Sequence, residues 1–310
     1  MTSTPETICE AFADANLAPP AGLHRNYLFA HCWGPFQKHD KPTSERFGLS
    51  FHFSRDGIGW KQMTPSGRFK PEFGSCFRDP CIKRNPVNGE FILAWTTDWN
   101  GSRLGIAHSR NLVDWKGARA VNIMERRNPV NTWAPSLQWC PEDALWYIFF
   151  TSSLLHGSPA YVGNRFWFAT TKDFVAFTEP RMLFDWGFGV NDIVTYRLAD
   201  GRYAMFYKCL LEHDIRLAFA PAITGPWLHS GRPLTPKSVF SEGPTCINID
   251  GCYYLYTDRS REGTMSCLRS SALTSEHWED ITGSLTFPSD VKHGDVLQVE
   301  GAIIAGLSRC

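Results

Sequence analysis

Three carboxylates and a histidine recur at equivalent places in the chain. Asp79, Asp192 and Glu242 each stand at the start of a short apolar segment, and His293 stands at the start of a fourth. Carboxyl groups that meet in one pocket can act as general acid and general base when their surroundings separate their pKa values. Burying such groups is costly unless they are paired or used. The pattern therefore predicts one polar site at which these side chains converge.

The alternative is that each carboxylate only accepts backbone N–H groups in a turn. That interpretation is favoured for four other aspartates, because they fall in apparent turns or at loop ends: Asp56, Asp98, Asp173 and Asp258.

The segments behind the three carboxylates share one pattern. Residues 241–258 are typical of a hairpin, with an apolar strand, an Asp-Gly turn and an aromatic strand. The same pattern returns at residues 78–95, 133–150 and 191–207. These four stretches are predicted to be copies of one structural unit.

A second pattern, a strand followed by a turn and an aromatic residue, counts the units. It occurs at residues 51–60, 106–115 and 168–177, with looser copies at 217–227 and 267–278. The closing aromatics lie at positions 60, 115, 177, 227 and 278, so successive copies are separated by 55, 62, 50 and 51 residues. Five copies of about fifty residues, each with four strands, predict an all-β fold, a five-bladed β-propeller.

The first unit lacks its inner strand near the amino terminus. Residues 293–299 can supply it, so the carboxy-terminal strand is predicted to pair into the first blade and close the ring. Residues 1–22, which end in Pro19-Pro20-Ala21-Gly22, are interpreted as an amino-terminal arm. Residues 23–310 are predicted to form a single propeller domain.

Composition removes several classes of function. The chain has 31 basic and 31 acidic residues, so it lacks the electrostatic signature of a nucleic-acid partner. No apolar stretch is long enough to span a membrane, and no leader peptide is apparent at the amino terminus. Ten scattered cysteines without zinc-like spacing fit a reducing compartment, and we expect a cytoplasmic protein.

The ordered motifs resemble glycoside hydrolase family 43, whose members are five-bladed propellers that cleave arabinofuranosyl or xylopyranosyl bonds. The most specific pieces are Arg78-Asp79-Pro80, Trp133-Ala134-Pro135, Asn191-Asp192, Glu242-Gly243-Pro244-Thr245 and Lys292-His293-Gly294. Each motif is weak alone, but together they span nearly the whole chain in order and at blade spacing.

The resemblance implies an inverting glycosidase. Asp79 matches the family's general base, Asp192 its orienting carboxylate and Glu242 its general acid. Inversion needs the base and acid carboxyls roughly 6.5–9.5 Å apart. Glu242 should hold a proton near neutrality, and Asp192 is expected to raise its pKa by like-charge repulsion.

Other residues are candidates for binding a small-molecule glycoside or oligosaccharide. Trp133 is a candidate stacking platform, and Arg78 could orient the base or bind a hydroxyl. The remaining candidates lie in loops or strand ends near the predicted mouth: His31, Trp33, Trp186, Phe188 and His293. The histidines show no metal-ligand spacing, so no metal site and no required cofactor are predicted. The resemblance implies at most a Ca²⁺ or Na⁺ ion near His293.

Two alternatives remain open at this stage. The same propeller could carry out a non-hydrolytic reaction on a specialised metabolite, since a fold does not imply a function. It could also be a carbohydrate-binding propeller without catalysis. Retention of all three acids favours the enzyme.

Overall fold

The structure is a computed structural model that describes residues 25–33, 48–63, 65, 68–275, 277–288 and 291–309. The predicted arm, residues 1–22, lies outside the described residues. Within them, none of the helices has the length and apolar composition that a membrane crossing needs.

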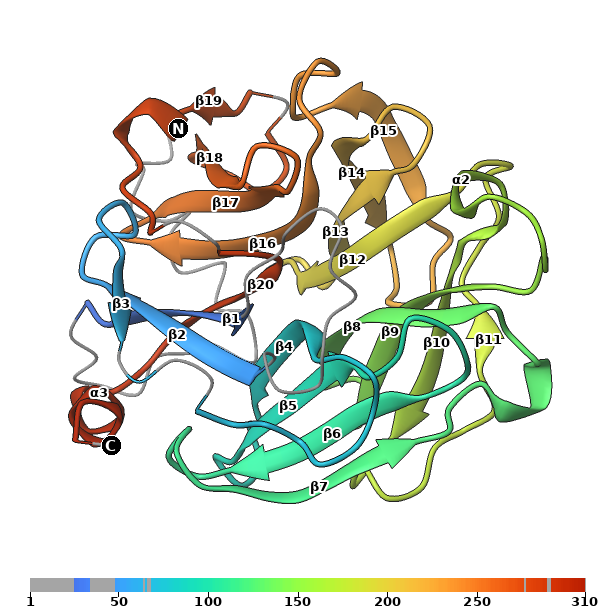
Figure 1. The fold of residues 1–310 in the computed structure, drawn as a ribbon. Helices are drawn as coiled ribbons and strands as arrows, with labels where there is room; N and C mark the ends of the chain where they lie inside the picture. The colour runs from blue at the N-terminus through green and yellow to red at the C-terminus, as the bar shows by residue number, and fades with distance from the viewer. Residues whose placement is uncertain are drawn as a thin grey trace.

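Five antiparallel sheets of four strands stand around a common axis, which makes the protein a five-bladed β-propeller (Figure 1). From the axis outward, the first blade contains β20 (Gly294–Gln298), β1 (Tyr27–Trp33), β2 (Gly48–Ser54) and β3 (Lys61–Met63), and the second contains β4 (Arg78–Arg84), β5 (Phe91–Thr96), β6 (Leu104–Ser109) and β7 (Trp115–Val121). The third blade contains β8 (Asn131–Cys140), β9 (Leu145–Ser153), β10 (Arg165–Thr171) and β11 (Arg181–Met182), and the fourth contains β12 (Val190–Arg197), β13 (Tyr203–Cys209), β14 (Asp214–Ala220) and β15 (Leu228–Pro233). The fifth blade contains β16 (Glu242–Ile249), β17 (Cys252–Arg259), β18 (Thr264–Ser270) and β19 (Glu279–Asp280).

The carboxy-terminal strand closes the ring, as predicted. β20 pairs with β1 in antiparallel register, from Tyr27 opposite Gln298 to His31 opposite Gly294. Each inner strand (β20, β4, β8, β12 and β16) contacts the inner strands of both neighbouring blades. Closure matters because it gives the inner edge of the first blade a partner and brings both ends of the described chain into one sheet.

The core consists of apolar layers between successive blades rather than one central cluster. Phe149 and Tyr207, for example, belong to the layer between the third and fourth blades. Because both faces of a blade are covered, burial does not alternate along β9 (LWYIFFTSS), in which all residues but the first are buried. The eight described cysteines are free, seven of them are buried, and six of the buried ones lie within these layers. They act as small apolar side chains.

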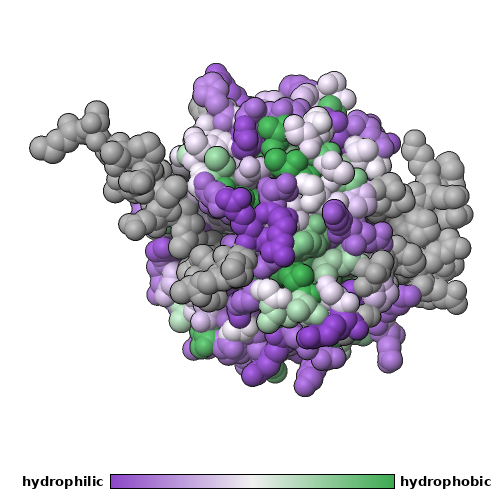
Figure 2. All heavy atoms as spheres, turned by 90° about the vertical axis from the view of Figure 1, so that its left-hand side faces the viewer, coloured by the Kyte–Doolittle hydropathy of each residue, from purple (hydrophilic) through white to green (hydrophobic). Residues whose placement is uncertain are grey.

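Short helices connect or flank the blades. They are η3 (Glu125–Arg127), α2 (Ala160–Gly163), η4 (Thr282–Ser284) and α3 (Gly301–Leu307). α2 lies in the long β9–β10 connection, which explains the 62-residue spacing between the second and third copies. α3 packs Leu307 into the layer between the first two blades. The side of the molecule around the first blade is largely hydrophilic, with small hydrophobic areas between polar groups (Figure 2).

Candidate active site

A β-bulge at the start of four inner strands sets the geometry of the site. The register with the next strand shifts between Arg78 and Cys81, Trp133 and Ser136, Asn191 and Val194, and Glu242 and Thr245. The first residue of the bulge has a positive φ each time: Asp79 (51°), Ala134 (49°), Asp192 (54°) and Gly243 (55°). Left-handed backbone at non-glycine residues is costly and clusters at functional sites.

The bulge corrects the predicted equivalence of the acids. Glu242 is the last paired residue before the bulge and corresponds to Arg78, whereas Gly243 is the first bulge residue and corresponds to Asp79 and Asp192. Because a bulge re-aims the chain locally, the residue before it and its first residue can both present side chains at the axial mouth. Aligning the prolines that follow (Pro80, Pro244) would have revealed the offset in the sequence.

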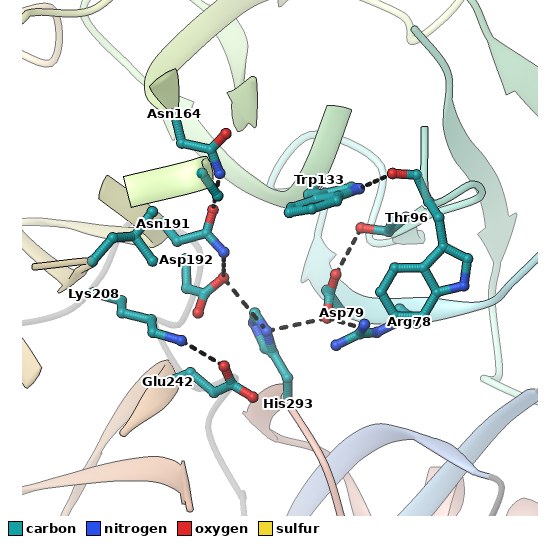
Figure 3. A pocket seen from close by; sticks show the side chains of 13 residues that line it. Arg78, Asp79, Thr96, Trp133, Asn164, Asn191, Asp192, Lys208, Glu242 and His293 are labelled. Carbon is teal, nitrogen blue, oxygen red and sulfur yellow. Dashed lines mark hydrogen bonds and ion pairs between the residues drawn. The ribbon is translucent and has the colours of Figure 1, made fainter. Parts of the chain in front are cut away.

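The bulges open into one cavity of about 220 Å³ at the mouth of the axis. Asp79, Asp192, Glu242 and His293 all line it, together with Arg78 and Trp133 (Figure 3). The structure thus brings six of the ten sequence-predicted site residues into one place.

Asp79 is held ionised by its neighbours. Its Oδ1 lies 3.2 Å from His293 Nδ1 and 3.8 Å from Arg78 Nε, and its Oδ2 accepts a hydrogen bond of 2.8 Å from Thr96 Oγ1. Burial alone would raise the pKa of Asp79, but Arg78, His293 and the hydrogen bonds outweigh it and hold that pKa well below its usual range.

His293 is the central cation of the site. Burial lowers its pKa, but the charges of Asp79 and Asp192 outweigh burial and raise the pKa of His293 to about 9. The imidazole is therefore protonated at neutral pH, and Figure 3 shows it between the two aspartates. The ring also packs against Gly243, where an added Cβ would lie 2.6 Å from His293 Cγ.

Asp192 is fixed by two donors. Its Oδ2 accepts 3.0 Å from the Gly243 backbone N–H, and its Oδ1 accepts 3.0 Å from Asn191 Nδ2, which is itself steadied by Asn164. Burial raises the pKa of Asp192, and the charges of Glu242 and Asp79 add to that effect, while His293 and Lys208 lower it. The hydrogen bonds orient a carboxylate toward the cavity from the fourth blade.

The pKa of Glu242 is shifted in the opposite direction to the one predicted from the sequence. Its Oε2 lies 2.6 Å from Lys208 Nζ, and the two side chains are 19% and 4% exposed. Burial would raise the pKa of Glu242, but the Lys208 charge and hydrogen bond outweigh it and lower that pKa. The prediction that Asp192 raises the pKa of Glu242 is therefore wrong, because the Lys208 charge lies closer and lowers it.

Asp258 is not a turn residue, contrary to the prediction. It lies in β17 directly opposite Glu242, is 1% exposed, and accepts a hydrogen bond of 3.0 Å from the His293 backbone N–H. Burial, followed by the Glu242 charge, raises the pKa of Asp258 to about 7. Asp56 and Asp173, in contrast, accept backbone N–H groups in turns as predicted.

Two tryptophans form an aromatic rim on the side of Asp79. Trp133 donates its Nε1–H to the Trp99 carbonyl at 3.0 Å, and the two rings meet edge to face at 6.5 Å. The Arg78 guanidinium lies over the Trp99 ring, 4.4 Å from its centroid. Such a rim offers apolar faces beside charged groups, which suits the mixed surface of a sugar ring.

Four predicted residues are not among those that line the cavity. His31 is buried against His52 between β1 and β2, on the face that carries Phe29 toward the fifth blade. Trp33 ends β1, and its side chain lies outside the described part of the structure. Trp186 and Phe188 pack with Phe184, Tyr207 and His229 in the layer between the third and fourth blades. Apolar rings fill that layer rather than the axis.

Several lining residues escaped the sequence analysis. Lys208 is one charge in the otherwise apolar strand β13, a visible anomaly in the sequence. Thr96 ends β5, where it accepts the Ala134 N–H and donates to Asp79. Asn164 and Ala160 come from the β9–β10 insertion, which no repeat pattern could place.

The residues around His293 do not fit a Ca²⁺ or Na⁺ ion. Nδ1 of His293 is engaged with Asp79 at 3.2 Å, and Ca²⁺ prefers oxygen ligands to an imidazole nitrogen. Within the described ranges, no group of three His, Cys, Asp or Glu side chains could hold a metal ion. Further along the axis the buried cation is the ammonium of Lys83, 3.0 Å from Asp295. We therefore derive no step through a metal.

Three carboxylates at the axial mouth of a five-bladed propeller form the arrangement that the motif resemblance implies. The chain belongs to the family described as a probable glycosyl hydrolase domain, related to glycosyl hydrolase family 43, whose model matches residues 24–303. The resemblance predicted from the motifs is confirmed. No functionally curated protein matches the chain.

Solved structures of family 43 share the fold. A thermostable family-43 glycoside hydrolase is 17% identical, with a TM-score of 0.52 over 68% of this chain and 74% of that one. A GH43 β-1,3-galactosidase with galactodeoxynojirimycin is 11% identical, with a TM-score of 0.54 over 70% and 79%. An exo-β-1,3-galactanase variant of Phanerochaete chrysosporium with β-1,3-galactotriose is 13% identical, with a TM-score of 0.52 over 73% and 53%.

Proposed function

We propose that the protein is an inverting glycosidase that removes terminal arabinofuranosyl or xylopyranosyl residues. The observation that carries the proposal is the convergence of Asp79, Asp192 and Glu242 in one cavity of about 220 Å³. Family membership supports hydrolysis of a glycosidic bond. The choice of a pentose rests on the motif resemblance, whereas two of the three named structural relatives are a β-1,3-galactosidase and an exo-β-1,3-galactanase.

Asp79 would act on the attacking water. Its low pKa keeps it ionised but makes it a weak base, so its main contribution is to orient and polarise the water. Thr96 and His293 fix its two oxygens, which leaves the carboxylate little freedom to turn away. Holding a reactant in a fixed position in this way lowers the entropic part of the barrier.

Glu242 would protonate the leaving oxygen. It lies on the other side of His293 from Asp79 (Figure 3), as expected for groups that act on opposite faces of a sugar. A general acid must hold its proton near neutrality, and the ion pair with Lys208 opposes this. Glu242 is therefore expected to take up a proton only when Lys208 finds another partner.

The test is a panel of 4-nitrophenyl glycosides that includes α-L-arabinofuranoside, β-D-xyloside and β-D-galactoside. We expect turnover on one of the two pentosides and losses of at least 10²-fold for Asp79→Asn. Glu242→Gln should lose more on sugars with poor leaving groups than on nitrophenyl glycosides, because nitrophenolate needs little protonation. Equal losses on both would remove Glu242 from the acid role. NMR of the first-formed anomer checks inversion, and a retained product would contradict the role of Asp79.

A non-catalytic carbohydrate-binding propeller is the second candidate, because Lys208 holds Glu242 as a charged ion pair. It predicts no turnover on any glycoside together with a sugar-induced rise in Tm. Turnover on the galactoside alone would instead keep hydrolysis and overturn the pentose assignment.

A further inference from the structure

A cluster of positive charge lies beside Glu242, on the side of the cavity away from Asp79. Lys208 Nζ lies 4.1 Å from the centroid of the Phe240 ring, and Arg261 Cζ lies 4.1 Å from the same centroid. His213 stacks on that ring at 4.6 Å. One aromatic ring thus gathers two cations and an imidazole, where cation–π attraction holds the charges in place.

The cluster contains more positive charges than acidic partners. Among the described residues, the only hydrogen-bonded partner shown for Lys208 is Glu242, and no ion pair is shown for Arg261. Lys208 is 4% exposed yet lines the cavity, so its ammonium is desolvated and can be reached only from inside the site. A buried ammonium with spare donors is a strong binding element for an anion.

We propose that the leaving-group side of the cavity recognises a sugar that carries a carboxylate, which pairs with Lys208 and thereby frees Glu242 to take up a proton. The inference rests on the proposed hydrolytic function, in which Glu242 faces the leaving oxygen. The anion is assigned as a carboxylate, as in a hexuronic acid, because Lys208 already binds the carboxylate of Glu242 and the substrate's carboxylate would take its place.

The groups around Glu242 explain why the exchange would produce an acid. Glu242 is faced from neighbouring elements by Lys208 (β13), Asp258 (β17), Asp192 (β12), Arg78 (β4) and His293, which precedes β20. With the Lys208 charge shared with the substrate, its pull on Glu242 weakens, and the negative charges of the substrate and Asp192 favour the protonated form of Glu242 against Arg78 and His293. The proton comes from solvent on binding and passes to the leaving oxygen when the glycosidic bond breaks.

Isothermal titration calorimetry with monosaccharides tests recognition without requiring turnover. We expect the wild-type protein to bind D-glucuronate about tenfold more tightly than D-glucose, the size of one charge-assisted hydrogen bond. Titration in two buffers of different ionisation enthalpy should show net proton uptake with glucuronate and none with glucose. Equal affinity for the two sugars, no binding of glucuronate, or tighter binding of glucose 6-phosphate than of glucuronate would overturn the proposal.

Variants locate the effect. Lys208→Met should abolish the preference for glucuronate, while Lys237→Met, which alters an exposed lysine paired with Glu212, should keep it. If Lys208→Met does not fold, Arg261→Gln at the exposed edge of the cluster should still reduce the preference about threefold. A full preference retained in either cluster variant would overturn the proposal.

A turnover comparison separates this inference from the proposed function. The matched substrates are aryl glycosides whose phenol bears a carboxymethyl group or its methyl ester, which differ in charge but little in leaving ability. We expect a lower KM for the carboxylate. Turnover with equal KM for the two substrates would contradict the acidic-sugar site but support the glycosidase. A preference for glucuronate without any turnover would support the acidic-sugar site but contradict the glycosidase.

Discussion

The backbone of Gly243 touches the ring of His293, and this contact fixes the centre of the site. Its φ of 55° belongs to the left-handed region, and a Cβ there would meet the imidazole at 2.6 Å. His293 in turn holds Asp79 and faces Asp192. The absence of a side chain at Gly243 thus allows the His293 ring to lie between Asp79 and Asp192.

Replacing that glycine tests the geometry. We expect Gly243→Ala to lower kcat/KM at least tenfold, because the methyl group displaces the imidazole, and to lower Tm by roughly 2–4 °C through backbone strain of about 1 kcal/mol. The matched control is Gly283→Ala in η4, where no atom lies within 4 Å of the added Cβ. An unchanged pH profile and rate for Gly243→Ala would show that the position of His293 does not matter.

At the scale of elements, the first blade carries a buried pair of histidines across β1 and β2. The rings of His31 and His52 lie 4.5 Å apart, and both residues are 2% exposed. Burial lowers the pKa of His31 to about 4 and that of His52 to about 3, the latter with a further contribution from His31. Both are neutral in the folded protein at pH 5–7 and would be protonated in the unfolded chain below pH 6.5.

This pair should make the fold sensitive to acid. Since the unfolded state binds more protons between the two sets of pKa values, stability falls as pH drops from about 6.5 toward 4. Over that pH range, we expect the free energy of unfolding of His52→Phe to fall by on the order of 2 kcal/mol less than that of the wild type. Urea denaturation at several pH values measures the difference. His277→Gln, at an exposed position, should keep the wild-type dependence. If His52→Phe kept it too, protonation of this pair would not be the cause.

The strands could be predicted because their signals are local and repeated. Hairpins with Asp-Gly or Asn-Gly turns and a returning aromatic define the blades, and the missing inner strand of the first unit identifies β20. The bulge could not be counted from apolar pattern alone, so Glu242 was placed one position out of register. Lys208 and Asp258 were missed because a strand pattern shows which side chains are apolar, not which charges meet across neighbouring blades.

At the scale of the whole molecule, a buried ion pair ties three blades together on the axis. Lys83 of β4 contacts both oxygens of Asp295 in β20, at 3.2 and 3.0 Å, and each side chain is 5% exposed. Asp295 also accepts from the Ile82 N–H at 3.0 Å and from Thr245 Oγ1 of β16 at 2.9 Å. The pair therefore provides an internal cation and its counter-charge between the first, second and fifth blades.

Removing one partner leaves a charge buried without compensation. We expect Asp295→Asn to destabilise the protein by about 3–5 kcal/mol, and Lys83→Met combined with Asp295→Leu to recover much of that loss, because the buried charges disappear together. Since an ammonium holds the axial position, chelation by EDTA should change neither the Tm nor the glycosidase activity of the wild type. A fall in Tm on chelation that Ca²⁺ reverses would show that a metal ion, rather than Lys83, supplies the positive charge that holds the inner strands together.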